Sequence, residues 1–246
     1  MKPVLLLQLR ENDEVSNDEF NAFVRYSELT PENFVRVRMD KSELNADQIN
    51  LDDYSAVIVG GGPWQVSDPD EKKSAIQKYQ DAELFKLLDR IVQEDKPYFG
   101  ACYGFGTLVM QQGGVESYEK YAETAEATKV TFTEAAQEDE LLKDLPKDFR
   151  AFGGHKESCQ ELPPNAVLLA GTKVCPHHML RIGKNVYASQ FHPELDAHGL
   201  CLRVDAYTNN GYFPPEEAEP LKESARGENM IVPMEILKRF ARKYVR

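Results

Sequence analysis

The sequence contains little cysteine and no long apolar run. Only four of its 246 residues are cysteines, and none of them belongs to a Cys-x-x-Cys pair. This sparse pattern excludes a disulfide-rich scaffold and the usual paired zinc motif. No apolar segment reaches the roughly 20 residues of a membrane-spanning helix. The apolar stretch at residues 4–9 is too short for the core of a signal peptide. We therefore expect a reduced, cytoplasmic protein.

Basic residues are also scarce relative to acidic ones. The chain has 29 lysines and arginines against 41 aspartates and glutamates, which gives a formal net charge of −12 at pH 7. Nucleic acids and anionic membrane surfaces select for clusters of basic residues, so we expect neither as a partner. With 41% hydrophobic and 28% charged residues, the composition is still that of a folded globular protein.

The first half of the chain alternates between apolar, strand-like segments and helical patterns. Residues 4–9, 56–59 and 97–100 are short apolar runs, typical of strands buried on both faces of a sheet. Helical patterns follow at residues 71–95 and 103–112. This alternation predicts an α/β fold with a mostly parallel central sheet and helices on both of its faces.

Other segments predict an early helix, antiparallel strands and a helical C-terminal part. Residues 16–19 have the Ser-x-x-Glu form of a capping box, which predicts a helix start at Ser16. Segments 179–182 and 186–190 flank a Gly-Lys-Asn turn, so we expect a hairpin that adds antiparallel strands to the sheet. After residue 195 the patterns are mostly helical.

The most informative segment is Gly100-Ala101-Cys102-Tyr103-Gly104. It lies between a predicted strand and a predicted helix, and it has the Gly-x-nucleophile-x-Gly form of a nucleophile elbow. At a helix start, partial positive charge would lower the pKa of the Cys102 thiol. The backbone N–H of Tyr103 would point toward a developing oxyanion. The alternative is a buried structural cysteine beside two packing glycines.

His192 is the best candidate for the base that a cysteine nucleophile requires. It follows the predicted strand at residues 186–190, so we expect it at the same rim of the sheet as Cys102. Glu194 is near enough in sequence to bind one imidazole nitrogen while the other faces the thiol. The alternative interpretation is a surface His-Pro turn.

A glycine-rich segment, Gly60-Gly61-Gly62-Pro63, is the third element. It lacks the Lys-Ser/Thr pair of a phosphate-binding loop, so it is either a second source of oxyanion N–H groups or a plain turn after a strand. In order and separation, this loop, the cysteine elbow and the His-Pro-Glu segment resemble the class I glutamine amidotransferase family. The resemblance covers residues 2–194 and is to a stand-alone form, similar to the amidotransferase domain of GMP synthase.

The resemblance implies a three-layer, flavodoxin-like α/β domain at residues 1–200 and a helical C-terminal extension, residues 201–246, packed on the same domain. It implies cleavage of a γ-glutamyl amide through a cysteine thioester, with release of ammonia and without a cofactor or metal. The implied roles are nucleophile for Cys102, general base and acid for His192, histidine-orienting carboxylate for Glu194, oxyanion donors for Gly62 and Tyr103, and substrate contacts for Gly61, Gly106, His155 and Gln190.

Gly106 departs from the family pattern. Many members have a glutamine four residues after the nucleophile, where it helps to hold the glutamine substrate. A γ-glutamyl peptide is therefore an alternative substrate, and a non-catalytic binding or partner protein with the same fold is a third interpretation. If ammonia is passed on, a separate synthase subunit would be the partner. A related protease and chaperone group usually has histidine directly after the cysteine, where this chain has Tyr103.

A further group of possible metal ligands is Cys175, His177 and His178. Its Cys-x-His-His form lacks the paired spacing of a zinc site. His198 and Cys201 are three residues apart and would share one helix face. We expect these side chains to pack or to line a loop rather than to bind a metal.

Overall fold

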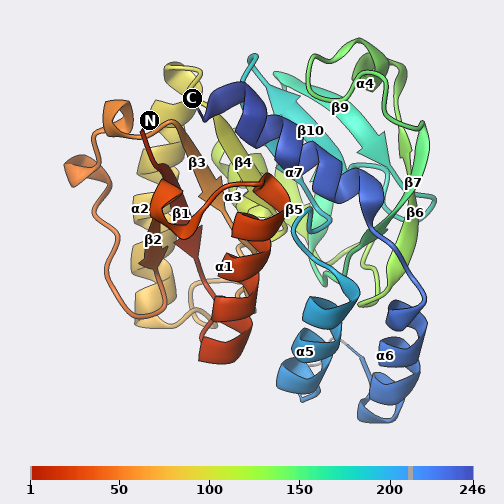
Figure 1. Cartoon of the computed structure of the whole chain (residues 1–246). Helices are drawn as coiled ribbons and strands as arrows, with labels where there is room; N and C mark the ends of the chain where they lie inside the picture. Colours follow the sequence, from red (N-terminus) through yellow and green to blue (C-terminus); the bar gives the residue numbers. More distant parts are fainter. Residues whose placement is uncertain (1, 210–212, 246) are drawn as a thin grey trace.

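Short apolar runs form the strands of one large mixed sheet (Figure 1). The structure, a computed structural model, describes residues 2–209 and 213–245. Strands pair in parallel on one side of β11 and antiparallel on the other. The predicted α/β class with added antiparallel strands is confirmed. In spatial order the strands are β2 (Phe34–Arg38), β1 (Val4–Gln8), β3 (Ala56–Val59), β4 (Tyr98–Ala101), β11 (Val186–Ser189), β10 (Met179–Ile182), β9 (Ala166–Gly171), β6 (Ala127–Phe132) and β7 (Asp148–Phe152).

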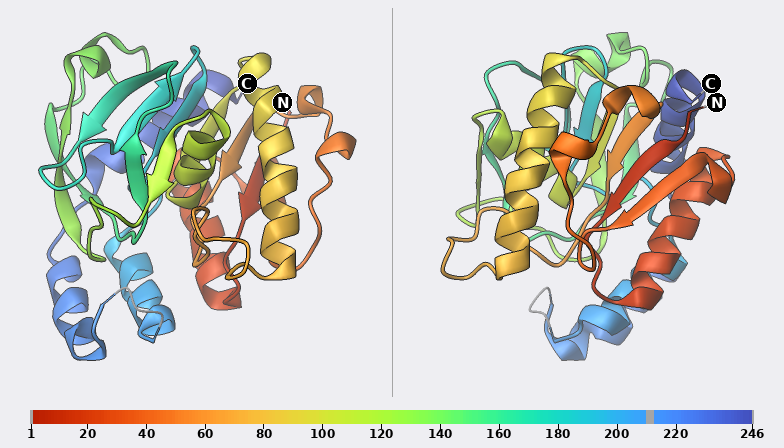
Figure 2. Two further views of the ribbon diagram at one scale, coloured as in Figure 1. Left: turned by 180° about the vertical axis from the view of Figure 1, so that it is seen from behind. Right: turned by 90° about the vertical axis from the view of Figure 1, so that its left-hand side faces the viewer.

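Helices cover both faces of the parallel half of the sheet (Figure 2). Alternate side chains of β1 enter opposite cores: Leu6 packs on the face of α1 and α7, and Leu7 on the face of α2 and α3. This two-sided burial explains why the strand sequences are continuously apolar. The helices are α1 (Asp13–Ser27), α2 (Ala75–Gln93), α3 (Tyr103–Gln111), α4 (Glu134–Glu138), α5 (Ala197–Tyr207), α6 (Ala218–Arg226) and α7 (Ile231–Tyr244). Short 3₁₀ turns lie at Pro31–Asn33, Ala46–Gln48, Leu51–Asp53 and Pro215–Glu217.

The helix α1 begins earlier than the capping-box pattern predicts. Its N-cap is Asn12, whose side-chain oxygen accepts a hydrogen bond from Val15 N at 3.1 Å. Ser16 and Glu19 are buried within the helix, where Glu19 accepts hydrogen bonds from Gln8 and Arg10. The prediction of a start at Ser16 was wrong because tertiary contacts, and not a cap, use these two side chains.

The C-terminal part is helical, as predicted. Helices α5 and α6 pack side by side below the sheet in Figure 1, and α7 packs against α1. Helix α5 runs across residue 200, so the expected division between residues 1–200 and 201–246 stays a prediction; residues 210–212 and 246 of the second part lie outside the described residues. No helix among residues 2–209 and 213–245 has the length and apolar character needed to cross a membrane.

The parallel pairing determines where polar side chains gather. Strands β1, β3, β4 and β11 point the same way, so their carboxyl ends meet at one rim of the sheet. In open α/β sheets this rim is where ligands bind. A small antiparallel pair, β5 (Val115–Ser117) with β8 (Ser158–Glu161), lies beside α3. It brings a segment from the middle of the chain close to the same rim.

Candidate active site

The junction between β4 and α3 is a strained turn centred on Cys102. Its backbone angles are φ 52° and ψ −94°, which a residue with a side chain rarely adopts. A Cβ atom on Gly100 would lie 2.6 Å from the backbone of Gly104, and one on Gly104 would lie 2.7 Å from Val59 O. Both glycines are therefore required by close packing. The strand and the helix predicted on either side of Cys102 are present, with the thiol at the rim between them.

His192 follows β11 and lies at the same rim. Its Nδ1 is 2.9 Å from Glu194 Oε1, and its backbone N–H donates to Phe152 O at 3.1 Å. The opposite edge of the ring lies against Gly61, because a Cβ there would be 2.4 Å from Cε1 and 3.2 Å from Nε2 of His192. Glu194 thus fixes one nitrogen of the imidazole, and Gly61 leaves space for the other.

Arginine side chains complete a buried charged network around Glu194. Arg203 of α5 donates from Nη2 to Glu194 Oε1 at 2.8 Å and lies 3.5 Å from Glu19 Oε1. Arg10, just after β1, donates to Glu19 at 2.9 Å. Two arginines and two glutamates thus share a buried site, with each charge facing one of opposite sign. We did not predict Arg10, Glu19 or Arg203 from the sequence; only Arg10 gave a signal, since it follows a strand that ends at this rim.

Burial and this charged network determine the protonation states of Glu194 and His192. Burial alone would raise the pKa of Glu194, but the nearby His192 and Arg203 outweigh it and hold that pKa well below its usual range. Burial, together with the charge of Arg203, lowers the pKa of His192 below its ordinary 6.5. At neutral pH the carboxylate is therefore charged and the imidazole is neutral, as a base must be.

The thiol is also neutral. Burial raises the pKa of Cys102 to about 12, and the charge of Arg10 offsets only part of this effect. The lowered pKa expected from the helix start was therefore wrong in direction. Between the described residues Cys102 and His192 there is no hydrogen bond; the thiol is 3.9 Å from Gln190 Nε2. Catalytic hydrogen bonds often shorten only when substrate is bound.

The backbone N–H groups of Gly62 and Tyr103 are the predicted oxyanion donors. Tyr103 is the first residue of α3, so its N–H has no partner within the helix. Gly62 lines the same pocket as Cys102 and Tyr103. In the part of the chain that the structure describes, neither N–H donates to a protein acceptor. Their role as oxyanion donors stays a prediction.

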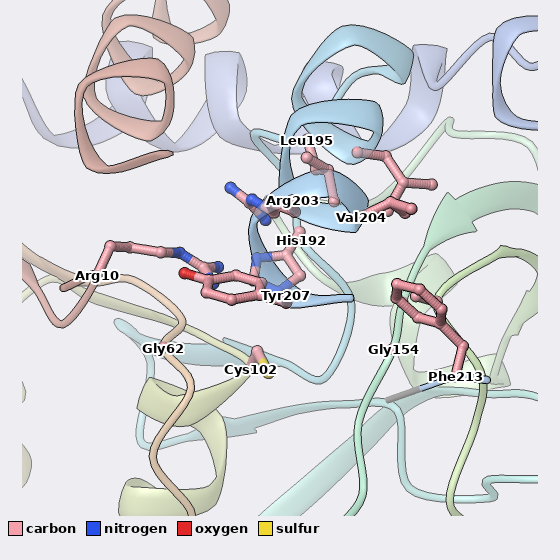
Figure 3. Close-up of a pocket in the computed structure, with 13 residues that line it drawn as sticks. Arg10, Gly62, Cys102, Gly154, His192, Leu195, Arg203, Val204, Tyr207 and Phe213 are labelled. Atoms are coloured by element: carbon pink, nitrogen blue, oxygen red, sulfur yellow. The ribbon is translucent and has the colours of Figure 1, made fainter. Parts of the chain in front are cut away.

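Cys102 lines two pockets of different character. The first, which we call the histidine-side pocket, is bordered by the catalytic candidates and by an apolar wall from α5 and the residues on either side of it (Figure 3). The second, the acidic pocket, lies under the β5–β8 pair. Lining residues of the histidine-side pocket include Arg10, His192, Leu195, Leu200, Arg203, Val204 and Phe213. Lining residues of the acidic pocket include Gly62, Trp64, Tyr103, Glu116, His155, Glu157 and Gln190.

His155 belongs to a buried hydrogen-bonded cluster behind the acidic pocket. Its Nε2 is 3.1 Å from Glu123 Oε2, which also lies 2.8 Å from His178 Nε2. Atoms of His155, Cys175 and His178 that could bind a metal lie within 4.8 Å of one another, and the same holds for Glu19, His192 and Glu194 at the rim. His177 points elsewhere, with Nδ1 2.9 Å from Cys159 O. Glu123 already binds Nε2 of both His155 and His178. The expected absence of a metal stays a prediction.

Comparisons with known proteins agree on one family. The glutamine amidotransferase class-I family model matches residues 22–199. The chain is 33% identical over 151 residues to the glutamine-hydrolysing GMP synthase of Elusimicrobium minutum, covering 60% of this chain and 26% of that protein. It is 31% identical over 111 residues to one subunit of the glutamine-hydrolysing GMP synthase of Pyrococcus abyssi, covering 45% of this chain and 57% of that one. The chain therefore spans less than two thirds of the length of these relatives.

Solved structures show the same fold over the whole chain. A glutamine amidotransferase from Thermotoga maritima superposes with a TM-score of 0.76 at 20% identity, covering 100% of this chain and 99% of that one. A glutamine amidotransferase from Methylobacillus flagellatus gives a TM-score of 0.72 at 19% identity, covering 100% and 94%. The helices after residue 199 therefore have counterparts in these structures, although the family model ends there.

Proposed function

The chain belongs to the class I glutamine amidotransferase family, and from this premise we propose that it cleaves a γ-glutamyl amide through a thioester on Cys102 and releases ammonia. The observation that carries the proposal is the backbone of Cys102. A cysteine held at φ 52° and ψ −94° at a helix start is strained, and such strain is typical of functional sites. A purely structural cysteine would need neither this turn nor the two packed glycines beside it.

The first half of the reaction uses the neutral thiol and the neutral imidazole. The sulfur of Cys102 attacks the γ-carbonyl carbon while His192 Nε2 takes the thiol proton. The N–H groups of Gly62 and Tyr103 stabilise the oxyanion. The C–N bond then breaks, and His192 gives its proton to the leaving nitrogen, so that ammonia departs and a γ-glutamyl thioester remains. Glu194 stabilises the imidazolium that forms transiently.

The second half is hydrolysis of the thioester. A water molecule gives a proton to His192 and attacks the same carbonyl carbon. The C–S bond breaks, the sulfur takes the proton back, and glutamate leaves. Neither step needs an oxidant, a reductant or a cofactor. Gly61, Gly106, His155 and Gln190 remain our candidates for substrate contacts, and three of them have a place at the site: Gly61 against His192, and His155 and Gln190 in the wall of the acidic pocket.

The test is release of glutamate and ammonia from L-glutamine by the full chain. We expect Cys102→Ala to lose all measurable release while keeping the thermal unfolding transition. Cys201→Ala is the matched control, because that cysteine lies in α5 with its thiol 3.7 Å from Lys222 O. Full turnover by Cys102→Ala would contradict the mechanism. Failure of the wild-type thiol to react with a glutamine-like electrophile would favour a non-catalytic binding protein.

A second candidate activity is hydrolysis of γ-glutamyl peptides. The observation in its favour is the apolar wall of the histidine-side pocket, formed by Leu195, Leu200, Val204 and Phe213. This wall offers an amine larger than ammonia a hydrophobic surface next to His192, which would protonate it. Comparison of kcat/KM for L-glutamine and for γ-glutamyl dipeptides separates the two activities.

We also propose a partner and a compartment. The relatives include proteins named as single subunits of a glutamine-hydrolysing GMP synthase, so a separate synthase subunit is the partner we propose for any ammonia transfer. The four cysteines are free in the structure, in keeping with a reducing compartment such as the cytoplasm. The net charge of −12 argues against nucleic acid or anionic membrane as partners.

A further inference from the structure

The side chain of Glu116 fills the space next to Gly106. A Cβ atom at residue 106 would lie 3.2 Å from Val66 Cγ1 and 3.3 Å from the carboxyl carbon of Glu116. A side chain of any length at this position would press on that carboxyl group. The position of the Glu116 carboxyl group therefore depends on the absence of a side chain at residue 106. Gly106 itself lies one helical turn after Cys102.

Two buried acceptor atoms of the acidic pocket have no partner. Glu116 is 6% exposed, and its Oε2 makes no hydrogen bond within residues 2–209 and 213–245. Gln190 is 2% exposed, and its Oε1 is likewise without a donor in the described chain. Both residues line the pocket that contains the Cys102 thiol. A buried acceptor without a donor is costly, so a pair of them beside the reacting atom points to a ligand that donates hydrogen bonds.

The charge of the pocket specifies what kind of donor fits. Glu157, the second carboxylate, already accepts hydrogen bonds from Val66 N and Ser67 N, both at 2.8 Å, and from Ser67 Oγ at 2.6 Å. Glu157 therefore contributes negative charge, while Glu116 keeps a free oxygen. The described residues that line the pocket include no lysine or arginine. A cationic hydrogen-bond donor would therefore fit this site.

We propose that Glu116, together with Gln190 Oε1, binds an ammonium group of the substrate, so that the enzyme selects carboxamides that carry a positive charge at the end opposite the scissile bond. The inference rests on the proposed amide hydrolysis at Cys102 and adds to it a residue that determines specificity. Glu116 does not take part in bond making or breaking. It holds the substrate on the far side of Cys102 from His192, since it lines the acidic pocket and not the histidine-side pocket.

Three small amides test this selection. L-Glutamine carries both an ammonium and a carboxylate, 4-aminobutanamide carries only the ammonium, and 4-carbamoylbutanoate carries only the carboxylate. In the wild type we expect kcat/KM for both ammonium-bearing amides to exceed that for 4-carbamoylbutanoate. In Glu116→Gln we expect kcat/KM for the two ammonium-bearing amides to fall by about 10- to 100-fold, mostly through KM, because a charge-assisted hydrogen bond is lost. In the same variant kcat/KM for 4-carbamoylbutanoate should rise, because the carboxylate of Glu116 no longer repels this anion.

Matched variants separate recognition from folding. Glu161→Gln removes a negative charge from the exposed end of the same β5–β8 pair and should leave all three values unchanged. Glu116→Asp keeps the charge and should recover part of the preference for ammonium. In Glu116→Gln we expect kcat/KM to fall for the cationic amide and to rise for the anionic amide. A merely structural role for Glu116 would not change the two values in opposite directions. Equal losses for all three amides in Glu116→Gln would overturn the proposal.

Binding distinguishes failure of this inference from failure of the proposed reaction. If the wild type hydrolyses none of the amides, the proposed function fails, and calorimetric titration of 4-aminobutanamide still tests the ammonium site. We expect the wild type and Cys102→Ala to bind 4-aminobutanamide, and Glu116→Gln to bind it about 10- to 100-fold more weakly. Equal affinity of the wild type and Glu116→Gln, or no binding to either, would remove Glu116 from substrate recognition.

Discussion

The two pockets that meet at Cys102 are built on opposite electrostatic principles. Beside the histidine-side pocket, Arg10 and Arg203 face Glu19 and Glu194, so each buried charge faces one of opposite sign. Glu194 Oε2 and Arg203 Nε and Nη1 still have no hydrogen-bond partner among the described residues. In the acidic pocket, Glu116 and Glu157 are buried without a lysine or arginine in the described lining. Burial and the nearby charge of Glu157 accordingly raise the pKa of Glu116 well above its usual range.

The difference shows which pocket has its charges paired within the protein. A balanced network holds His192 in one orientation whether or not a substrate is present, which is what proton transfer requires. An unbalanced pocket becomes balanced only when a cation enters, which is what selection of a substrate requires. The same side-chain type, a buried glutamate, thus has opposite roles on the two sides of one thiol.

We expect the largest effect when the network around Glu194 loses one of its positive charges. In Arg203→Met, Glu194 and Glu19 lose a buried cation, and we expect the free energy of unfolding to fall by about 3–5 kcal/mol. Arg203→Lys should recover part of the loss, and Arg226→Met, at an exposed position of α6, should cause little change. Chemical denaturation measures all three variants. Under the same conditions Glu116→Gln should be as stable as the wild type or more so, because it replaces a buried carboxyl group whose Oε2 has no donor among the described residues. If Arg203→Met and Glu116→Gln are destabilised equally, the two pockets do not differ as we propose.

A smaller effect concerns the pH dependence of turnover. Because burial and Arg203 lower the pKa of His192 below 6.5, the imidazole stays neutral down to that pH and takes a proton only in more acidic solution. We expect kcat/KM for L-glutamine to be constant near pH 7 and to fall about tenfold per unit only below pH 6.5.

The Arg203→Lys variant supplies the control for this profile. It keeps a positive charge near His192, so the acid limb should stay below pH 6.5 even where the rate is reduced. An acid limb above pH 6.5 in the wild type would contradict a neutral His192 at physiological pH. Alkylation of Cys102 should in contrast accelerate with rising pH well above 8, since the pKa of its thiol is raised to about 12.

Sequence patterns predicted the parts of the site that depend on local geometry. The elbow around Cys102 needs glycines at fixed offsets, and the hairpin before His192 needs a turn between two strands, so both were visible as short patterns. Arg203 was not predictable because its partners lie on other elements and its own helix has no motif. Glu116 was missed for the same reason: β5 places it under Gly106 only through pairing with β8. The pKa of Cys102 was predicted in the wrong direction because burial depends on the whole fold.

The smallest expected effect comes from adding one methyl group to the acidic pocket. In Gly106→Ala the new Cβ would lie 3.2 Å from Val66 Cγ1 and 3.4 Å from Glu116 Oε1, so the carboxylate must move by a few tenths of an ångström. Because hydrogen-bond energy depends on distance and angle, the preference for 4-aminobutanamide over 4-carbamoylbutanoate should fall by about threefold, with kcat for L-glutamine nearly unchanged. Gly227→Ala is the matched control, since Gly227 ends α6 away from both pockets and a Cβ there would lie 3.7 Å from Ser224 O. If Gly106→Ala changes kcat for every amide and leaves the preference intact, then Gly106 serves the packing of α3 rather than the position of Glu116.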